Sequence, residues 1–212
     1  MCGIAGILAN STWHHDPADV ARAMAFRLQH RGPDDQGWWV DSDARIALAH
    51  RRLEVIDTTL GGHQPKLSPG GRYAITFNGE MYNFPELRVE LEQLGVTFST
   101  DSDTEVLLAA IEQWGLESAL GRAVGMFAFA IWDRQQRRLS LVRDRAGEKP
   151  LYYGLIAGCL VFASELKAFQ EMPGFDRRID HAALRLYLQR ACVPAPFSIF
   201  ESIRKVLPGH VL

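Results

Sequence analysis

The second residue of the chain is a cysteine, and it stands in the opening run MCGIAGI of residues 1–7. If Met1 is removed, Cys2 carries a thiol and a free α-amino group on one residue. A thiolate is a strong nucleophile, and an α-amine of pKa about 7.7–8.0 can serve as its base near neutral pH. Since most cysteines near a chain end are ordinary small residues, a catalytic role for Cys2 requires suitable partners elsewhere.

Three further groups of residues can supply such partners. Arg52 follows an apolar strand pattern; a guanidinium can bind a carboxylate through two hydrogen bonds, although a surface salt bridge is the commoner role. Asn78-Gly79 is a dipeptide typical of turns, yet an amide NH₂ and a glycine N–H are also the donors that an oxyanion hole needs. Asp103 lies in a segment typical of a helix start, and its carboxylate, together with that of Glu80, can bind an ammonium group.

Together these groups match one kind of ligand. Arg52 can hold an α-carboxylate and Asp103 an α-ammonium. Asn78 and Gly79 can polarise an amide carbonyl that Cys2 attacks. An amino acid with a side-chain amide, above all glutamine, carries that set of groups. The prediction requires that segments far apart in the sequence converge in space.

The composition is that of an ordinary globular protein, with 47% hydrophobic and 23% charged residues and a formal net charge of −2. This balance gives no support to nucleic-acid binding. No apolar run approaches the roughly 20 residues that span a bilayer, and no signal peptide is recognisable, so no membrane partner is expected. The cysteines Cys2, Cys159 and Cys192 show no CxxC spacing, which argues against a thiolate metal site and for a reducing compartment, the cytoplasm.

The hydrophobic patterns predict antiparallel strands interleaved with helices, an α+β fold. A buried strand over residues 3–8 would hold Cys2 at its start. Asn78-Gly79 is expected to close the strand 73–77 with a turn. The other predicted strands cover residues 38–40, 46–50, 126–132, 139–143, 151–155 and 160–163, and the predicted helices cover residues 17–28, 85–94, 103–114 and 181–190.

Six motifs, in order along the chain, resemble those of class II glutamine amidotransferases, and in particular of their asparagine synthetase branch. The motifs are RGPDDQG at residues 31–37, AHRRL at 49–53, GHQP at 62–65, NGEMYN at 78–83, SDTE at 102–105 and RDRAGEKPLYY at 143–153. With the opening MCGIAGI they extend over essentially the whole chain. Two slight departures, Met81 and Glu148, lie outside the predicted chemistry.

The resemblance implies an N-terminal nucleophile hydrolase fold, a four-layer α/β/β/α sandwich of two mainly antiparallel sheets. It implies Cys2 as the nucleophile, with its own amino group as base, and Asn78 and Gly79 as the oxyanion hole. It also implies a set of residues that bind L-glutamine, namely Arg52 for the α-carboxylate, Glu80 and Asp103 for the amino group, Asn78, and Val55 and Ile56 for backbone contacts.

By the same resemblance we expect a glutaminase domain over residues 1–178. Residues 179–212 are expected to form the connection to, and the start of, a C-terminal synthetase domain of a longer chain. That domain would use the ammonia, by default to make asparagine from aspartate. No metal or cofactor is expected in this chain, which has no glycine-rich phosphate loop; ATP and Mg²⁺ are expected only in the synthetase domain. Whether the protein forms a homodimer stays open.

Three alternatives stay open as well. The ammonia acceptor can be another carboxylate, as in antibiotic or surface-polysaccharide biosynthesis. An N-terminal cysteine hydrolase acting on another amide, such as an acylase, would not require the clamp of Arg52 and Asp103. If Met1 is retained, Cys2 lacks its amine base and the domain would only bind or assemble.

Overall fold

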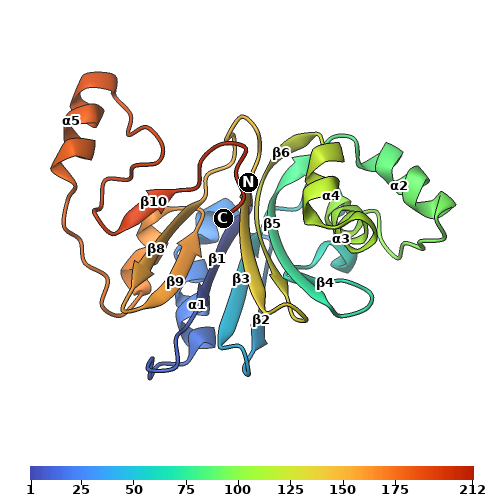
Figure 1. Ribbon diagram of the computed structural model, residues 1–212, viewed down its shortest axis with the longest axis horizontal. Helices are drawn as coiled ribbons and strands as arrows, with labels where there is room; N and C mark the ends of the chain where they lie inside the picture. The colour runs from blue at the N-terminus through green and yellow to red at the C-terminus, as the bar shows by residue number, and fades with distance from the viewer.

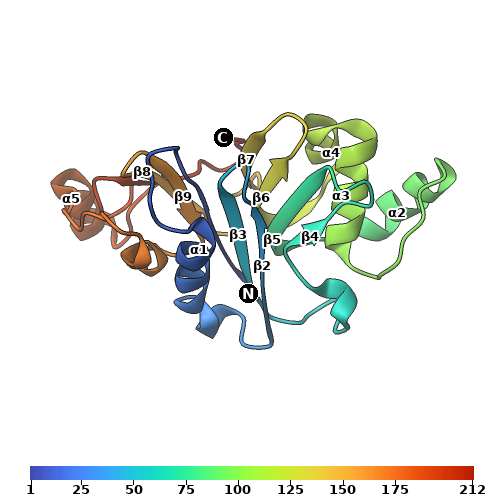
Figure 2. The same cartoon turned by 90° about the horizontal axis from the view of Figure 1, so that it is seen from below.

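Two antiparallel β-sheets lie face to face in the structure, a computed structural model that describes residues 1–212 (Figure 1). The first sheet has the strand order β10-β8-β9-β1-β3-β2 and the second the order β4-β5-β6-β7. Helix α1 covers the outer face of the first sheet, and α2, α3 and α4 lie beyond the second (Figure 2). The predicted α+β class and four-layer α/β/β/α arrangement are therefore confirmed.

The strands are β1 (Gly3–Leu8), β2 (Asp35–Asp41), β3 (Ile46–Arg52), β4 (Lys66–Leu67), β5 (Tyr73–Met81), β6 (Gly125–Asp133), β7 (Arg138–Arg143), β8 (Tyr152–Ile156), β9 (Cys159–Ala163) and β10 (Ile203–Lys205). The helices are α1 (Pro17–Phe26), α2 (Phe84–Gln93), α3 (Asp103–Trp114), α4 (Leu116–Arg122) and α5 (His181–Arg190), with short 3₁₀ helices at Gln29–Arg31, Leu60–Gly62 and Leu166–Glu171. None of the five α-helices combines the length and the apolar character that a membrane span requires.

Three apolar layers hold the sheets and helices together. The layer between the two sheets contains Ile4 and Leu48 from the first sheet and Trp132 from the second. On the outer faces, α1 packs through Met24 on the first sheet, and α3 packs through Leu107 on the second. Because side chains alternate between the two faces of a strand, every second residue of β1, β3 and β5 faces the layer between the sheets.

The start of α3 is determined by its N-cap. The Ser102 hydroxyl accepts a hydrogen bond from the Thr104 N–H at 3.2 Å, and the helix begins at Asp103. Ser102 thus supplies the cap that satisfies the helix end. The carboxylate of Asp103 is not needed for this purpose and points to other partners.

One sequence prediction is wrong at an important place. Asn78-Gly79 does not form a turn, because β5 continues through both residues to Met81, with Asn78 opposite Ala128 and Gly79 opposite Phe127 of β6. A Cβ at position 79 would collide with the Met126 carbonyl oxygen and the Phe127 Cα. Glycine is therefore present here to allow close strand contact and not to form a turn.

Two further differences concern the helices and the C-terminal segment. Helix α4 was not predicted, and β10, which pairs with β8, lies in a segment predicted as an irregular connection. The pattern of three consecutive strand residues is too short to be recognised from sequence. The predicted domain boundary after residue 178 stays a prediction.

The collision at Gly79 leads to a stability prediction. We expect Gly79→Ala to lower the free energy of unfolding by about 1–3 kcal/mol, because β5 and β6 must separate to admit the methyl group. Gly121→Ala is the matched control: position 121 lies in α4, and a Cβ added there would have no neighbouring atom within 4 Å, so alanine should be neutral or stabilise the protein by up to about 1 kcal/mol. Urea unfolding measures both, and equal stability of the two variants would contradict the packing argument.

Candidate active site

All eight residues predicted for the site line a single cavity of about 230 Å³. They come from four regions: the segment before β1, the end of β3 with its following loop, the second half of β5, and the start of α3. The eight are Cys2, Arg52, Val55, Ile56, Asn78, Gly79, Glu80 and Asp103. The predicted convergence is thus present in the structure.

Cys2 is held in place by the end of β3. Its Sγ lies 3.4 Å from the Leu53 N–H, which donates to it, and 3.7 Å from the Leu53 carbonyl oxygen. The Arg31 Nε donates to the Cys2 carbonyl oxygen at 2.8 Å. Pairing of Gly3 with Arg51 continues this attachment into the sheet. The thiol is therefore fixed at one wall of the cavity.

Burial raises the pKa of the Cys2 thiol above its usual value of 9.0, and the Asp103 carboxylate adds to this. The Leu53 N–H, the chain's amino terminus and Arg52 oppose the increase without cancelling it. The thiol is consequently protonated at neutral pH. Attack by Cys2 requires a base that removes this proton during the reaction.

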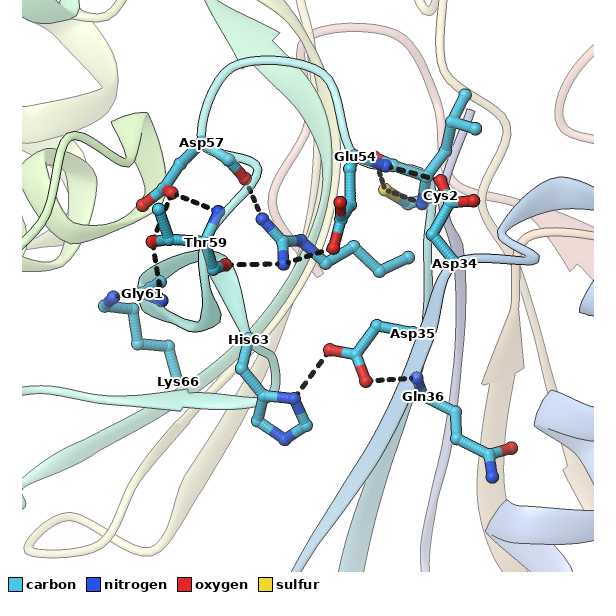
Figure 3. Close-up of polar contacts among 12 residues, drawn as sticks. Cys2, Asp34, Asp35, Gln36, Glu54, Asp57, Thr59, Gly61, His63 and Lys66 are labelled. Carbon is cyan, nitrogen blue, oxygen red and sulfur yellow. Dashed lines mark hydrogen bonds and ion pairs between the residues drawn. The ribbon is translucent and has the colours of Figure 1, made fainter.

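The loop after Arg31 is more than a simple turn. Arg31 also pairs with Glu165 at 2.8 Å, and the Gly32 carbonyl oxygen accepts from the Arg51 Nε at 3.0 Å. Asp34 accepts from the Glu54 N–H at 2.9 Å (Figure 3). These bonds join the loop to the Cys2 backbone, to β3 and to the segment after β3, so the loop supports two walls of the cavity.

The Arg52 guanidinium is buried at the end of β3. Its Nη1 donates to Glu54 at 3.2 Å and to the Thr59 carbonyl oxygen at 2.9 Å, and its Nη2 donates to the Asp57 carbonyl oxygen (Figure 3 shows these partners). A guanidinium has five N–H donors, so the Nε proton and one Nη2 proton have no protein acceptor. Arg52 is held in place and keeps donors for a ligand carboxylate.

Asn78 presents an unpaired donor to the cavity. Its side chain is 1% exposed, and its Nδ2 has no hydrogen-bond partner in the structure. An unpaired buried amide donor is costly to the folded state. The cost is explained if a ligand oxygen binds there. Gly79 is the next residue of β5, and it also lines the cavity.

Asp103 provides the negative charge of the site. Its Oδ2 accepts from the Met81 N–H at 3.0 Å, and its side chain is buried. Burial is the main reason why the pKa of this carboxyl is above its usual value of 3.8; Glu80 contributes in the same direction, while hydrogen bonds from Met81 and Thr104 lower it. A cationic ligand group would relieve this penalty.

Val55 and Ile56 form an exposed edge of the cavity, with 57% and 40% of their surfaces accessible. They lie in the loop that follows β3 and leads to the carbonyl groups that hold Arg52. The predicted backbone contacts of these two residues with a ligand stay a prediction.

Sequence reasoning missed Gln64, Thr104 and Lys149, which are buried and also line the cavity. All three stand inside recognised motifs, and that was the available signal, but none was given a role. Lys149 is presented by a rigid loop: the Asp144 carboxylate accepts from the Lys149 N–H at 3.1 Å, and the Arg143 Nε donates to the Lys149 carbonyl oxygen at 2.8 Å.

Comparisons with known proteins identify the family. A family model of glutamine amidotransferase domains matches residues 1–212. Asparagine synthetase [glutamine-hydrolyzing] 1 of Bacillus subtilis is 41% identical over 99% of this chain, and amidase chry2 of Gibberella zeae is 31% identical over all of it. The chain spans only about a third of the length of these relatives, 33% and 32%.

A solved structure has the same fold. The PRPP amidotransferase of B. subtilis, determined with ADP and GMP, superposes with a TM-score of 0.69 over 84% of this chain and 45% of that chain, at 24% identity. This likeness, together with the two stacked antiparallel sheets, identifies the fold as that of the N-terminal nucleophile hydrolases.

The raised pKa of Asp103 predicts how stability changes with pH. At neutral pH the ionised carboxylate costs the folded state more than the unfolded one, because the folded pKa is the higher. We expect Asp103→Asn to raise the free energy of unfolding at pH 7, and the gain to disappear as the pH falls through the folded pKa to below 3.8. Urea unfolding at several pH values measures this. Asp101→Asn is the control at an exposed side chain; a neutral or destabilising Asp103→Asn at pH 7 would refute the prediction.

Proposed function

The chain belongs to the family of glutamine amidotransferase domains, and from this premise we propose that its cavity hydrolyses the side-chain amide of L-glutamine and releases ammonia. The observation that carries the proposal is the unpaired Nδ2 of Asn78 in the same small cavity as the Cys2 thiol. An amide oxygen placed on Asn78 brings its carbon toward Cys2. Both ends of an amino acid zwitterion then have a charged partner available, Arg52 and Asp103.

Substrate binding follows from the charges around the cavity. The free Nε and Nη2 protons of Arg52 receive the α-carboxylate in the bidentate geometry that guanidinium favours. Asp103, with Glu80 beside it, receives the α-ammonium. The side-chain amide then extends toward Asn78 and Gly79, because the two charged groups hold the other end of the molecule.

The chemistry proceeds through a thioester. The α-amine of Cys2 takes the thiol proton, and Sγ forms a bond to the amide carbon of glutamine. The Asn78 amide and the Gly79 N–H stabilise the oxyanion of the tetrahedral intermediate. The C–N bond breaks, and the protonated amine returns its proton to the leaving nitrogen, giving ammonia and a γ-glutamyl thioester. Water, deprotonated by the same amine, cleaves the thioester to glutamate and restores the thiol.

The mechanism depends on the removal of Met1, which we propose as part of the function. While Met1 remains, the nitrogen of Cys2 is an amide and cannot act as a base. Met1 itself lines the cavity, so its removal also enlarges the space beside Sγ. The retained form corresponds to the alternative of a binding domain without catalysis.

The ammonia released by this reaction needs an acceptor. We propose a synthetase domain beyond this chain that uses ATP and Mg²⁺ to amidate aspartate, supported by the asparagine synthetase relative and by the share of its length that this chain leaves unmatched. Amidation of another carboxylate is the alternative, and it is supported by the relative named amidase chry2, whose name does not refer to asparagine. All three cysteines are free thiols, which supports a reducing compartment, the cytoplasm.

The first test separates binding from chemistry. We expect Asn78→Ala to lower kcat for L-glutamine about 10²–10³-fold with little change in KM, because it removes an oxyanion donor. Arg52→Ala should instead raise KM, by about 10²-fold, because it removes the partner of the α-carboxylate. Steady-state ammonia release measures both. Unchanged glutamine turnover by Arg52→Ala, with cleavage of other amides, would favour the acylase alternative.

The second test concerns the amino terminus. Protein that begins at Cys2 is expected to release ammonia from L-glutamine, and protein that retains Met1 is expected to be inactive because it has no amine base. Mass spectrometry of the N-terminus assigns each preparation. Cys2→Ala is the negative control in both forms. Full activity of the form that retains Met1 would exclude the amine as the base.

A further inference from the structure

The proposed function requires a fixed distance between two parts of the protein. The oxyanion donors lie on β5 at Asn78 and Gly79, whereas the carboxylate for the α-ammonium lies on α3 at Asp103. In glutamine the amino nitrogen and the amide carbon are separated by a chain of three carbons. The protein can use both groups on one substrate only if α3 and β5 keep a constant spacing.

One connection between the two elements lies at the end of this segment of β5. The Met81 N–H donates to the Asp103 Oδ2 at 3.0 Å. Both residues are buried, with exposed fractions of 1% and 6%. The apolar packing of α3 on the second sheet holds the body of the helix, whereas the Asp103 carboxylate is bonded to β5 through one oxygen only.

The second connection starts from the short strand β4. Its pairs Lys66–Ile75 and Leu67–Ala74 define a register that, continued by two residues, places Gln64 opposite Phe77. No third strand pair forms there. Instead the Gln64 side chain accepts from the Phe77 N–H at 2.6 Å. The amide side chain thus takes the place of a missing strand neighbour at the residue directly before Asn78.

The other end of the same amide reaches α3. The Gln64 Nε2 donates to the Thr104 hydroxyl at 3.4 Å, and that hydroxyl lies 3.4 Å from the Asp103 Oδ1. Both contacts are long, and both residues are buried at the wall of the cavity, with Gln64 6% and Thr104 2% exposed. The Thr104 hydroxyl is also one of the groups that stabilise the ionised Asp103.

We propose that Gln64 is a positioning residue that fixes the position of the oxyanion donors relative to the ammonium-binding carboxylate. In this way it couples recognition of the α-amino group to cleavage of the amide. Together with the Met81–Asp103 bond, the Gln64 amide connects β5 to α3 at both ends of the segment Asn78–Glu80. This inference rests on the proposed function and adds a residue and a purpose to it.

A buried glutamine is costly unless both ends of its amide are paired, and an apolar residue of similar size could fill the volume. Both partners of Gln64 adjoin residues of the site: Phe77 precedes Asn78, and Thr104 follows Asp103. Packing alone would not require a side chain that forms hydrogen bonds at both of these positions.

The test measures how much the enzyme gains from the α-amino group. Glutaramate has the carboxylate and the side-chain amide of glutamine but lacks the amino group, so the ratio of kcat/KM for L-glutamine to kcat/KM for glutaramate reports the use of Asp103. We expect Gln64→Met, which keeps the length of the side chain and loses both hydrogen bonds, to lower this ratio by about tenfold. A merely structural defect would lower both kcat/KM values equally and leave the ratio unchanged.

A second pair of variants covers the case in which Gln64→Met does not fold. Thr104→Val removes the hydroxyl and should lower the ratio, whereas Thr104→Ser keeps the hydroxyl and should retain it. In the double variant of Gln64→Met and Thr104→Val the ratio should fall no further than in the lower single variant, because both changes break one connection. Gln113→Met, at an exposed position of α3, controls for the substitution itself.

The outcomes separate the two proposals. If the chain that begins at Cys2 hydrolyses L-glutamine and the ratio falls in Gln64→Met and in Thr104→Val, the inference is supported. If glutamine is hydrolysed and the ratio is unchanged in the variants that fold, the positioning role is overturned while the proposed function stands. If the chain that begins at Cys2 hydrolyses neither compound, both proposals are overturned.

Discussion

At Gly79 the backbones of β5 and β6 approach too closely for any side chain, because a Cβ there would meet the Met126 carbonyl oxygen and the Phe127 Cα. With this close contact, β5 stays paired to β6 through Asn78 to Met81. Strand alternation then turns Asn78 toward the first sheet, on the same face as Ala74 of the layer between the sheets. The close pairing at one glycine therefore decides where the unpaired amide of Asn78 points.

The same alternation explains how the other site residues meet Asn78. Cys2 lies two residues before Ile4, and Arg52 lies four residues after Leu48; Ile4 and Leu48 both belong to the layer between the sheets. The site is thus the polar end of an apolar layer: where the layer ends, the inward positions carry a thiol, a guanidinium and an amide. Their mutual position depends on the packing of the two sheets, which also makes it rigid.

Much of this could be predicted from the sequence because the signals are local. The strand 3–8, the helix 103–114, and the motif residues Cys2 and Arg52 each depend on a few neighbouring residues. The prediction of a turn at Asn78-Gly79 is wrong because Gly79 is needed for the close contact with β6, a strand about fifty residues later in the chain. Gln64 could not be recognised as a connector, because its amide completes a strand edge and reaches a helix, and neither contact leaves a periodic pattern.

The polar groups of the cavity also define the ligand that would complete them. The Asn78 Nδ2 has no acceptor, Asp103 has a raised pKa, and Arg52 has two free donors, so each is incompletely satisfied. Such groups destabilise a folded protein unless a ligand completes them.

His50, in the same layer, differs: burial lowers its pKa to about 3, with Arg52 contributing, so its ring is neutral at ordinary pH. No second positive charge from this ring competes with Arg52 for an anion. Asn78 still lacks an acceptor, Asp103 lacks a cation and Arg52 lacks an anion. A free α-amino acid with a side-chain amide carries a group for each of the three.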